Sequence, residues 1–156
     1  MRRMLIIGVC VLVLGWGTTP SQAAGDFCFE EAGATYGVHP TLLWAIAKHE
    51  SGFNSQAVNR ANKNKSLDFG VMQINSEWAR PDRLGPEVWS NLGDPCYNIK
   101  VGAYILADCL RRYGHTPEGL GCYNAKSPEK RIAYARKIMA IVDALRAETA
   151  VASAVD

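Results

Sequence analysis

The sequence predicts a single domain that is mainly α-helical, and three observations support this fold class. Capping residues stand directly before Pro95, Pro117 and Pro128, which is a pattern typical of helix starts. Apolar residues recur every three or four positions along the expected helices. The chain has 156 residues, and the 133 that remain once the first 23 are removed suit one domain with a single core.

Residues 1–23 are predicted to be a signal peptide that is cleaved after Ala23. The segment has two arginines, an apolar run over residues 4–14 and a polar stretch that ends in Ser-Gln-Ala. The alternative is an uncleaved membrane anchor, but a helix that crosses a bilayer needs about 20 apolar residues and this run is shorter. The protein is therefore expected to be exported.

The helices are predicted from their boundary residues, in chain order. Asp26 is expected to cap a first helix that runs to Tyr36, and Pro40 is expected to start a second helix that Gly52 closes. Further helices are expected over 76–79, 86–90, 95–113, 117–124 and 128–147.

Two regions fall outside this helical pattern. Residues 54–93 are rich in Asn, Gly and Pro, so the chain between their short helices is expected to be irregular or to form a small β-hairpin. Residues 148–156 follow the last apolar stripe and are expected to be a flexible tail. That stripe predicts a core-facing side of the last helix, made of Ile132, Ala135, Ile138, Met139, Val142 and Leu145.

Charge and ligand spacing argue against nucleic acid and against a metal. Without Arg2 and Arg3 the 17 basic residues become 15, which equals the 15 acidic residues. The mature chain therefore lacks the excess of positive charge that is typical of nucleic-acid-binding proteins. The three histidines are scattered and no Cys-x-x-Cys pair exists. Phe53 stands where an H-E-x-x-H motif needs its second histidine. No metal and no other cofactor is expected.

Four cysteines remain after signal cleavage, namely Cys28, Cys96, Cys109 and Cys122. In an exported protein an even number of cysteines favours disulfides over a metal site. The residues alone leave all three pairings open.

Glu50 is the residue that breaks the pattern of the second helix. Leu43, Ile46 and Ala47 fall on one helical face, and Glu50 occupies the next step of the same face. A carboxyl group held against apolar side chains is partly desolvated, which raises its pKa and keeps it protonated near neutrality. Such a group suits the acid of glycosidic bond cleavage. The alternative is a glutamate at a helix end that faces solvent or pairs with a basic residue.

Three segments carry a family resemblance. They are HESGFN (49–54), DFGVMQIN (68–75) and GCYNAK (121–126). In this order they resemble the motifs of the soluble lytic transglycosylases, over roughly residues 26–140, and are similar to the small members that serve secretion systems and pili. The resemblance implies a goose-type-lysozyme-like fold, with 24–147 as the catalytic domain, and a periplasmic location.

The resemblance also implies residue roles. Glu50 matches the only catalytic acid/base of the family, and Asp68 resembles a second aspartate of some secretion-associated members and of hen-type lysozymes. The substrate-binding positions it implies are Ser51, Met72, Gln73, Asn75, Tyr123 and Asn124, and for Ser51 a structural hydroxyl is the alternative. Two residues depart from the family pattern: Cys122 replaces a small residue and Lys126 replaces a glycine.

These roles lead to one main functional hypothesis and two alternatives. The main hypothesis is a monomeric lytic transglycosylase that cleaves the MurNAc-GlcNAc β-1,4 bond of peptidoglycan strands to 1,6-anhydro products, in the service of a secretion or pilus apparatus. The first alternative is a lysozyme-type hydrolase that uses Glu50 and Asp68. The second is a non-catalytic peptidoglycan-binding module for assembly.

The resemblance favours one disulfide pattern. Cysteines at positions like Cys28 and Cys96 are familiar in the secretion-associated members, where they tie the N-terminus to the body. That leaves Cys109 and Cys122 on consecutive helices with a short connection, which makes a second bridge feasible. The alternative for this second pair is two buried free thiols.

Overall fold

The computed structural model describes residues 27–154 of the chain, so the expected signal peptide and the expected Asp26 cap lie outside the described residues. The elements are α1 (Phe29–Tyr36), α2 (Pro40–Ser51), β1 (Val58–Asn59), β2 (Asp68–Phe69), β3 (Ile74–Asn75), η1 (Ser76–Ala79), α3 (Glu87–Asn91), α4 (Pro95–Tyr113), α5 (Pro117–Gly121) and α6 (Pro128–Ser153). The mainly α fold class is confirmed. Among the described helices, none is both long enough and apolar enough to cross a membrane.

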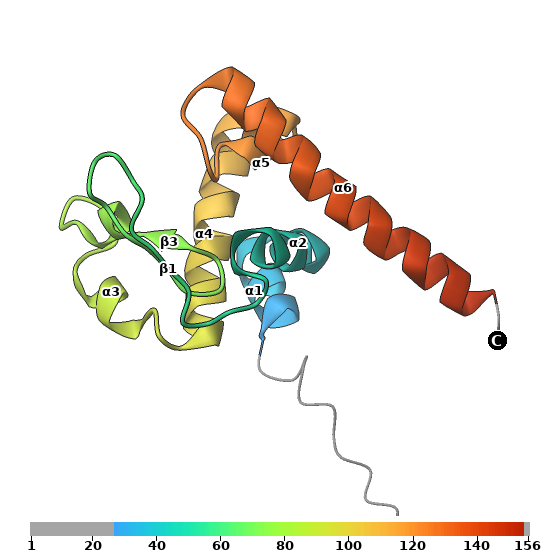
Figure 1. The fold of residues 1–156 in the computed structure, drawn as a ribbon, viewed down its shortest axis with the longest axis horizontal. Coiled ribbons are helices and arrows are strands. Elements are labelled where there is room, and N and C mark those ends of the chain that lie inside the picture. Colours follow the sequence, from blue (N-terminus) through green and yellow to red (C-terminus); the bar gives the residue numbers. More distant parts are fainter. Residues whose placement is uncertain (1–26, 155–156) are drawn as a thin grey trace, which may run out of the picture.

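Helix α4 is the centre of the arrangement. It packs against α1 and α5 and also touches α2 and β3, and in Figure 1 it runs between the small sheet on one side and α2 and α6 on the other. The core is continuous across these elements. Its largest fully buried side chains include Leu43, Ile46, Met72, Ile74, Leu92, Ile99, Leu106 and Ile138.

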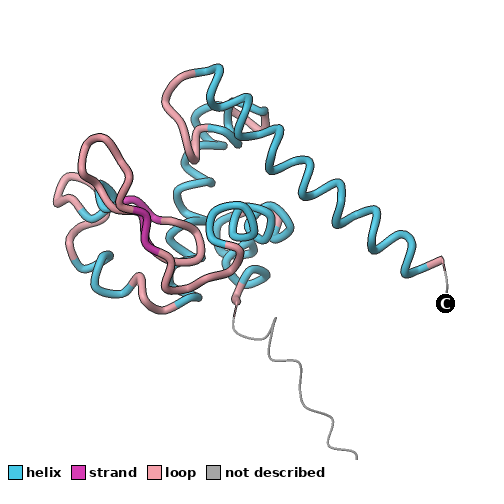
Figure 2. Tube along the Cα trace, viewed as in Figure 1, coloured by secondary structure: helices cyan, strands magenta, loops and turns pink. Residues whose placement is uncertain are grey.

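The β region is a three-stranded antiparallel sheet in the order β1-β2-β3, one strand more than the expected hairpin. Each strand has only two residues, and most of the surrounding segment is loop (Figure 2). Val58 pairs with Phe69, and Asp68 pairs with Asn75. The two pairings place β1 and β3 on either side of β2, which contains Asp68.

A buried amide fixes the turn between β2 and β3. Asn98 of α4 is fully buried, and its Oδ1 accepts a hydrogen bond of 2.8 Å from the Met72 backbone N–H. Its Nδ2 donates to the carbonyl oxygens of Phe69 (3.0 Å) and Leu92 (3.2 Å). Gly70 has a φ of +81°, and a Cβ there would lie 2.2 Å from Asn98 Nδ2, so only glycine fits. The turn that leads into β3 is thereby held at a fixed position on α4.

The helix boundaries largely follow the capping residues. The His39 side chain accepts from Thr41 N at the start of α2, and Gly52 ends that helix with a φ of 60° in the left-handed region, as predicted. The first helix differs, because it begins at Phe29 after Cys28, which makes no side-chain cap. Helix α5 ends at Gly121, three residues earlier than predicted. A Cβ at Gly121 would lie 2.0 Å from the Arg131 carbonyl oxygen, so α5 ends where it meets the backbone of α6.

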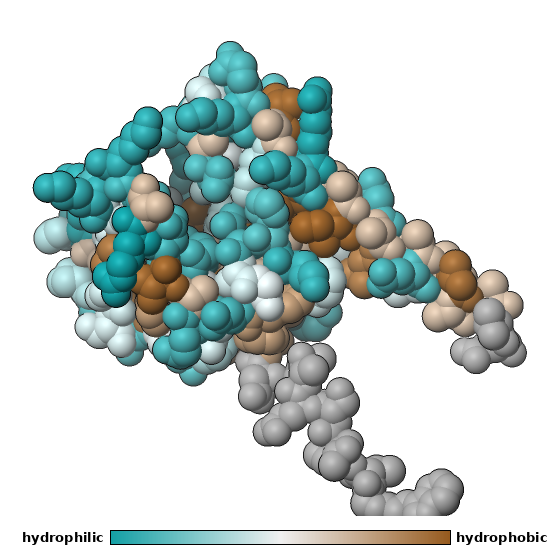
Figure 3. All heavy atoms as spheres, in the orientation of Figure 1, coloured by the Kyte–Doolittle hydropathy of each residue, from teal (hydrophilic) through white to brown (hydrophobic). Residues whose placement is uncertain are grey.

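The last helix is longer than predicted. The prediction that it ends near 147 is wrong, because α6 continues to Ser153. No glycine or proline interrupts the chain after Pro128, and the alanines of 144–152 favour helix. The extra turns project away from the body, and apolar side chains show along this helix in Figure 3.

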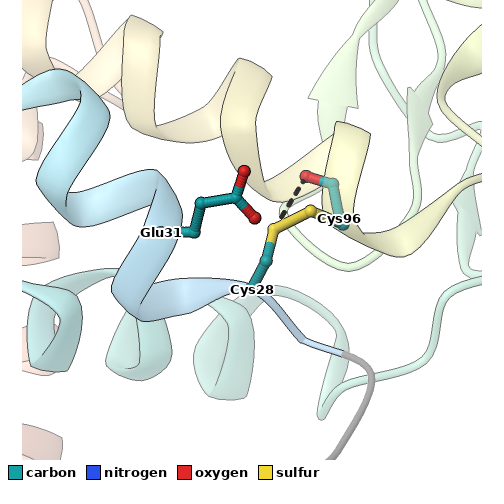
Figure 4. Close-up of side chains that lie close together, drawn as sticks. All are labelled: Cys28, Glu31 and Cys96. Carbon is teal, nitrogen blue, oxygen red and sulfur yellow. Dashed lines mark hydrogen bonds between the residues drawn. A yellow bond between two sulfur atoms is a disulfide. The ribbon is translucent and has the colours of Figure 1, made fainter.

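Both predicted disulfides are present, and the pairing is confirmed. Cys28 joins Cys96, and Cys109 joins Cys122, with Cα–Cα distances of 5.2 and 5.7 Å. Glu31 lies beside the first bridge, as Figure 4 shows, and forms an ion pair of 2.7 Å with Lys100.

The group of Cys28, Glu31 and Cys96 is not a metal site, although its ligand-type atoms lie within 4.8 Å of one another. Both sulfurs are bonded to each other, and a metal is held by thiolates. The dashed approach in Figure 4, from Cys28 Sγ to the Cys96 carbonyl oxygen (3.4 Å), is a close contact, because a disulfide sulfur has no proton to donate. The bridge is therefore structural.

Candidate active site

A polar cleft of about 480 Å³ contains Glu50. It lies between the loops that flank the sheet and the corner where α5 leads into α6, and Figure 3 shows the surface hollowed there. Other residues that line it are Asn62, Ser66, Asp68, Gln73, Asn75, Trp78, Arg83, Arg112, Cys122, Tyr123, Asn124 and Lys126. The cleft thus joins three segments that are far apart in the sequence.

Glu50 lies in the last turn of α2, with its side chain half-buried at the floor of this cleft. The pKa of its carboxyl group is raised to about 6, mainly by burial and to a smaller extent by the negative charge of Asp68. A hydrogen bond from Tyr134 and the charge of Lys137 act in the opposite direction. The Tyr134 hydroxyl donates to Oε1 at 2.6 Å, and Oε2 has no partner within the described residues. The rise in pKa predicted from the helix pattern is confirmed, but a pKa of about 6 leaves most of the carboxyl groups ionised at pH 7, so the expectation that Glu50 stays protonated near neutrality is not met.

Two tyrosines, one in the connection between α5 and α6 and one in α6, stack beside the carboxyl group. The Tyr123 and Tyr134 rings lie 6.4 Å apart with an interplanar angle of 21°. The Tyr123 hydroxyl donates to the Met72 carbonyl oxygen at 2.8 Å, which ties the α5–α6 connection to the turn before β3. His49 contacts the Tyr134 ring edge-on, at 5.5 Å. The pair joins α2, the sheet and α6 around Glu50.

Tyr134 is the functional residue that the sequence analysis missed. Its side chain is 4% exposed and lies on the core side of α6, next to Ala135 and one turn before Ile138. The sequence does place a tyrosine beside the apolar stripe of this helix. A buried tyrosine hydroxyl needs a hydrogen-bond partner, so this position could have been singled out. The stripe does not reveal that this partner lies 84 residues away.

Tyr134→Phe is expected to move the pH profile of the enzyme toward higher pH. The lost hydrogen bond favours the ionised carboxylate, so its removal raises the pKa of Glu50 and extends the protonated form upward. Because the carboxyl group also loses its orientation, the maximal rate should fall roughly tenfold. The alkaline limb of kcat/KM measures the shift. Tyr97→Phe, which removes a hydroxyl with no side-chain partner among the described residues, is the control, and an unmoved limb would contradict the assignment.

Asp68 is held by three side-chain amides. Its Oδ2 accepts from Asn59 (2.8 Å) and Asn62 (2.9 Å), and its Oδ1 accepts from Asn75 (2.6 Å). This carboxylate therefore cross-links all three strands' ends and the loop between β1 and β2. It lines the cleft with Glu50 and influences it through its charge, but most of its lone pairs are already engaged.

Four of the six expected substrate residues line the cleft, namely Gln73, Asn75, Tyr123 and Asn124. Gln73 uses its amide N–H groups on the carbonyl oxygens of Ala57 and Gly70. Asn75 donates to Asp68 and Ser66 and accepts from Glu77 N. The exposed Asn124 amide has no side-chain partner within the described residues, so it is the amide most available to a sugar N-acetyl group.

The other two expected substrate residues, Ser51 and Met72, lie outside the cleft lining. The Ser51 hydroxyl donates to the Val71 carbonyl oxygen at 2.8 Å and so joins the end of α2 to the β2–β3 turn. The Met72 side chain is fully buried and packs against Gly102 of α4. The contacts that the structure shows for both residues are therefore structural ones.

Both departures from the family pattern have a place in the structure. Cys122, which forms the second disulfide, precedes Tyr123 at the edge of the cleft. The Lys126 side chain is exposed and lines the same cleft.

A half-buried acid with a raised pKa, set in an open polar cleft between helices and a small sheet, defines a lysozyme-like enzyme that acts on a glycan. Residues 27–140 match the family described as the Transglycosylase SLT domain, and the chain belongs to that family. It is accordingly a peptidoglycan lytic transglycosylase.

Curated relatives match most of the chain. Protein IpgF of Shigella flexneri is 38% identical over 143 residues, which cover 88% of each chain. Invasion protein IagB of Salmonella typhimurium (strain SL1344) is 36% identical over 132 residues, which cover 81% of each chain. A peptidoglycan-binding-like protein of Escherichia coli O157:H7 is 35% identical over 149 residues, with 88% of this chain and 89% of the relative covered. The resemblance inferred from the three motifs is confirmed.

Proposed function

We propose that the enzyme cleaves the MurNAc-GlcNAc β-1,4 bond without water and leaves a 1,6-anhydromuramoyl end. The observation that carries this proposal is the contrast between the two carboxyl groups of the cleft. Glu50 has a raised pKa and an oxygen without a partner among residues 27–154, whereas Asp68 is engaged by three amides. One group is ready to transfer a proton, and the other lacks the freedom expected of a nucleophile.

The reaction needs only Glu50 as acid and then as base. Protonated Glu50 gives its proton to the bridging oxygen, and the bond from that oxygen to muramoyl C1 breaks. The muramoyl N-acetyl group stabilises C1 from within the substrate. The Glu50 carboxylate then removes the proton of the C6 hydroxyl, and O6 bonds to C1. Glu50 ends the cycle protonated, and no water is consumed.

The isotopic composition of the product tests this proposal. Purified peptidoglycan digested in H₂¹⁸O should give muropeptides with an anhydro end and no ¹⁸O at C1, because the attacking oxygen belongs to the substrate. A hydrolase would place one ¹⁸O in each new reducing end. Reducing-end products that carry the label would overturn the proposal in favour of lysozyme-type hydrolysis, and mass spectrometry reads both outcomes.

Asp68 gives a specific reason to keep hydrolysis as a second candidate function, because it lines the cleft and its charge acts on Glu50. In retaining hydrolases the second carboxylate forms or stabilises the intermediate, and its loss removes nearly all activity. A charge that only tunes Glu50 has a milder effect. The two roles therefore differ in the size of the defect that a neutral substitution causes.

Asp68→Asn is expected to retain at least about a tenth of the wild-type rate and to shift the alkaline limb of kcat/KM to lower pH. Loss of the negative charge lowers the pKa of Glu50, so less of it is protonated at a given pH. The new amide also faces three donors, which should cost about 1–3 kcal/mol in the free energy of unfolding. A folded variant whose rate falls a thousandfold or more would favour the two-carboxylate hydrolase instead.

We further propose that the enzyme works in the periplasm and opens the wall locally for a secretion system or pilus. Two disulfides accord with an oxidising compartment. A relative with 81% coverage is named an invasion protein, which supports the link to a secretion apparatus. Deletion of the gene should reduce secretion or piliation while the bulk wall stays intact, and complementation with the Glu50→Gln form should fail. Rescue by that form would instead support a non-catalytic assembly module.

A further inference from the structure

A second concavity, of about 450 Å³, opens beside the catalytic cleft. We propose that it holds a carboxylate of the peptide branch that muramoyl residues carry, so that the enzyme favours peptide-bearing glycan over glycan whose peptides lack free carboxylates. This inference rests on the proposed function, because it assumes that a peptidoglycan strand occupies the cleft.

The second concavity is continuous with the cleft. Trp78, Arg83 and Arg112 line both, so the two hollows share one wall. One side of the second concavity is a face of α4, where Tyr104 and Arg112 are separated by two helical turns. The other side is η1 and the turn after it, with Leu84. A groove that branches from a glycan cleft suits a substituent that branches from a sugar ring.

The charges of this side groove favour an anion. Two aspartates line it, but Asp108 is paired with Arg112 at 2.8 Å and with Arg111. Asp82 is paired at 3.0 Å with Arg80, which also pairs with Glu77 at 3.2 Å. Three arginines thus balance the three carboxylates around the groove. The aspartates therefore do not cancel the remaining cation of the groove, Arg83.

Arg83 has no acidic partner within the described residues. Its guanidinium carbon lies 4.8 Å from the centre of the Trp78 ring, which holds the side chain at the junction of the two hollows. A guanidinium presents paired N–H donors that match the geometry of a carboxylate. Peptide chemistry supplies the remaining contacts, because Leu84 and the 40% exposed Tyr104 offer apolar surface to aliphatic side chains.

The test compares binding of two defined probes to a catalytically inactive Glu50→Gln protein. One probe is a peptidoglycan tetrasaccharide with stem peptides that keep their free carboxylates. The other is the same molecule with those carboxylates converted to carboxamides. The first should bind about five to ten times more tightly, which is the scale of one partly exposed charge-assisted hydrogen bond. Titration calorimetry measures both dissociation constants without any turnover.

Two further substitutions in the Glu50→Gln background identify the site, and a third serves as the control. Adding Arg83→Gln should abolish the difference between the probes, and adding Tyr104→Ser should weaken both probes alike. Adding Arg136→Gln, which removes the same charge from an exposed site on α6, should leave the difference intact. Equal affinities for the two probes, or a difference that survives Arg83→Gln, would overturn the inference. The ¹⁸O experiment decides the proposed reaction separately, because it does not depend on these affinities.

Discussion

Glu50→Gln is expected to fold normally and to lose activity by at least 10²–10⁴-fold, the range that general acid–base catalysis supplies. The loss should lie at or beyond the upper end, because one carboxyl group serves both proton transfers. Glutamine keeps the shape of the side chain and can still accept the hydrogen bond from Tyr134. It cannot donate a proton to the leaving oxygen at neutral pH.

The measurement is release of soluble muropeptides from purified peptidoglycan, with the melting temperature recorded alongside. Glu148→Gln is the matched control, since it makes the same chemical change at an exposed position near the far end of α6. That variant should keep the wild-type rate. Retention of a tenth of the wild-type rate by Glu50→Gln would sink the assignment of Glu50.

Glu50→Gln should also stabilise the protein at alkaline pH, relative to wild type. Burial raises the pKa of Glu50 from 4.5 to about 6, so the folded state favours the neutral acid. The stability that this group contributes is fully present below pH 4.5 and is lost as the pH rises through 6. The shift of 1.5 units, at 1.36 kcal/mol each, corresponds to about 2 kcal/mol.

Urea denaturation at pH 4 and pH 8 checks the direction of this pH dependence of stability. The free energy of unfolding of Glu50→Gln, relative to wild type, should be higher at pH 8 than at pH 4 by about 2 kcal/mol. An equal difference at both pH values would mean that Glu50 is not held in a neutral form by burial. Burial of the acid would then carry no pH-dependent stability cost.

Much of the fold was predictable because its helix boundaries are encoded locally. Pro40, Pro95 and Pro117 begin helices where expected, and Gly52 ends one, since each effect depends on the backbone of a few neighbouring residues. The small sheet was not resolved in the same way. Its strands have two residues each, too short for a period-two pattern, and they are held by side-chain amides around Asp68.

The site was predictable in part. Glu50 is visible in the sequence, because a carboxyl group interrupts an apolar helical face. The partner of that group is not, since the Tyr134 hydroxyl reaches it only after α6 has crossed α2. The motif likewise does not tell whether a side chain faces substrate or structure. Ser51 turns its hydroxyl to Val71, and Met72 enters the core, although both belong to the segments that carry the family resemblance.

Removing the two disulfides in turn is expected to affect stability and activity in opposite order. Their loops differ in length, because Cys28 and Cys96 are 68 residues apart and Cys109 and Cys122 are 13 apart. On chain-entropy grounds, replacing the first pair by serine should cost about 4 kcal/mol in the free energy of unfolding, and replacing the second about 3 kcal/mol. The larger effect belongs to the bridge that ties α1 to the start of α4.

Activity should show the opposite order. Cys122 lines the cleft and directly precedes Tyr123, whose ring stacks on the tyrosine that contacts Glu50. The first bridge lines neither hollow. At a temperature where both double-serine variants are folded, the variant without Cys109–Cys122 should therefore lose more of its rate. Denaturation curves and muropeptide release, measured on the same samples, test both orders. If the rates follow stability instead, the second bridge only secures the fold and does not position Tyr123.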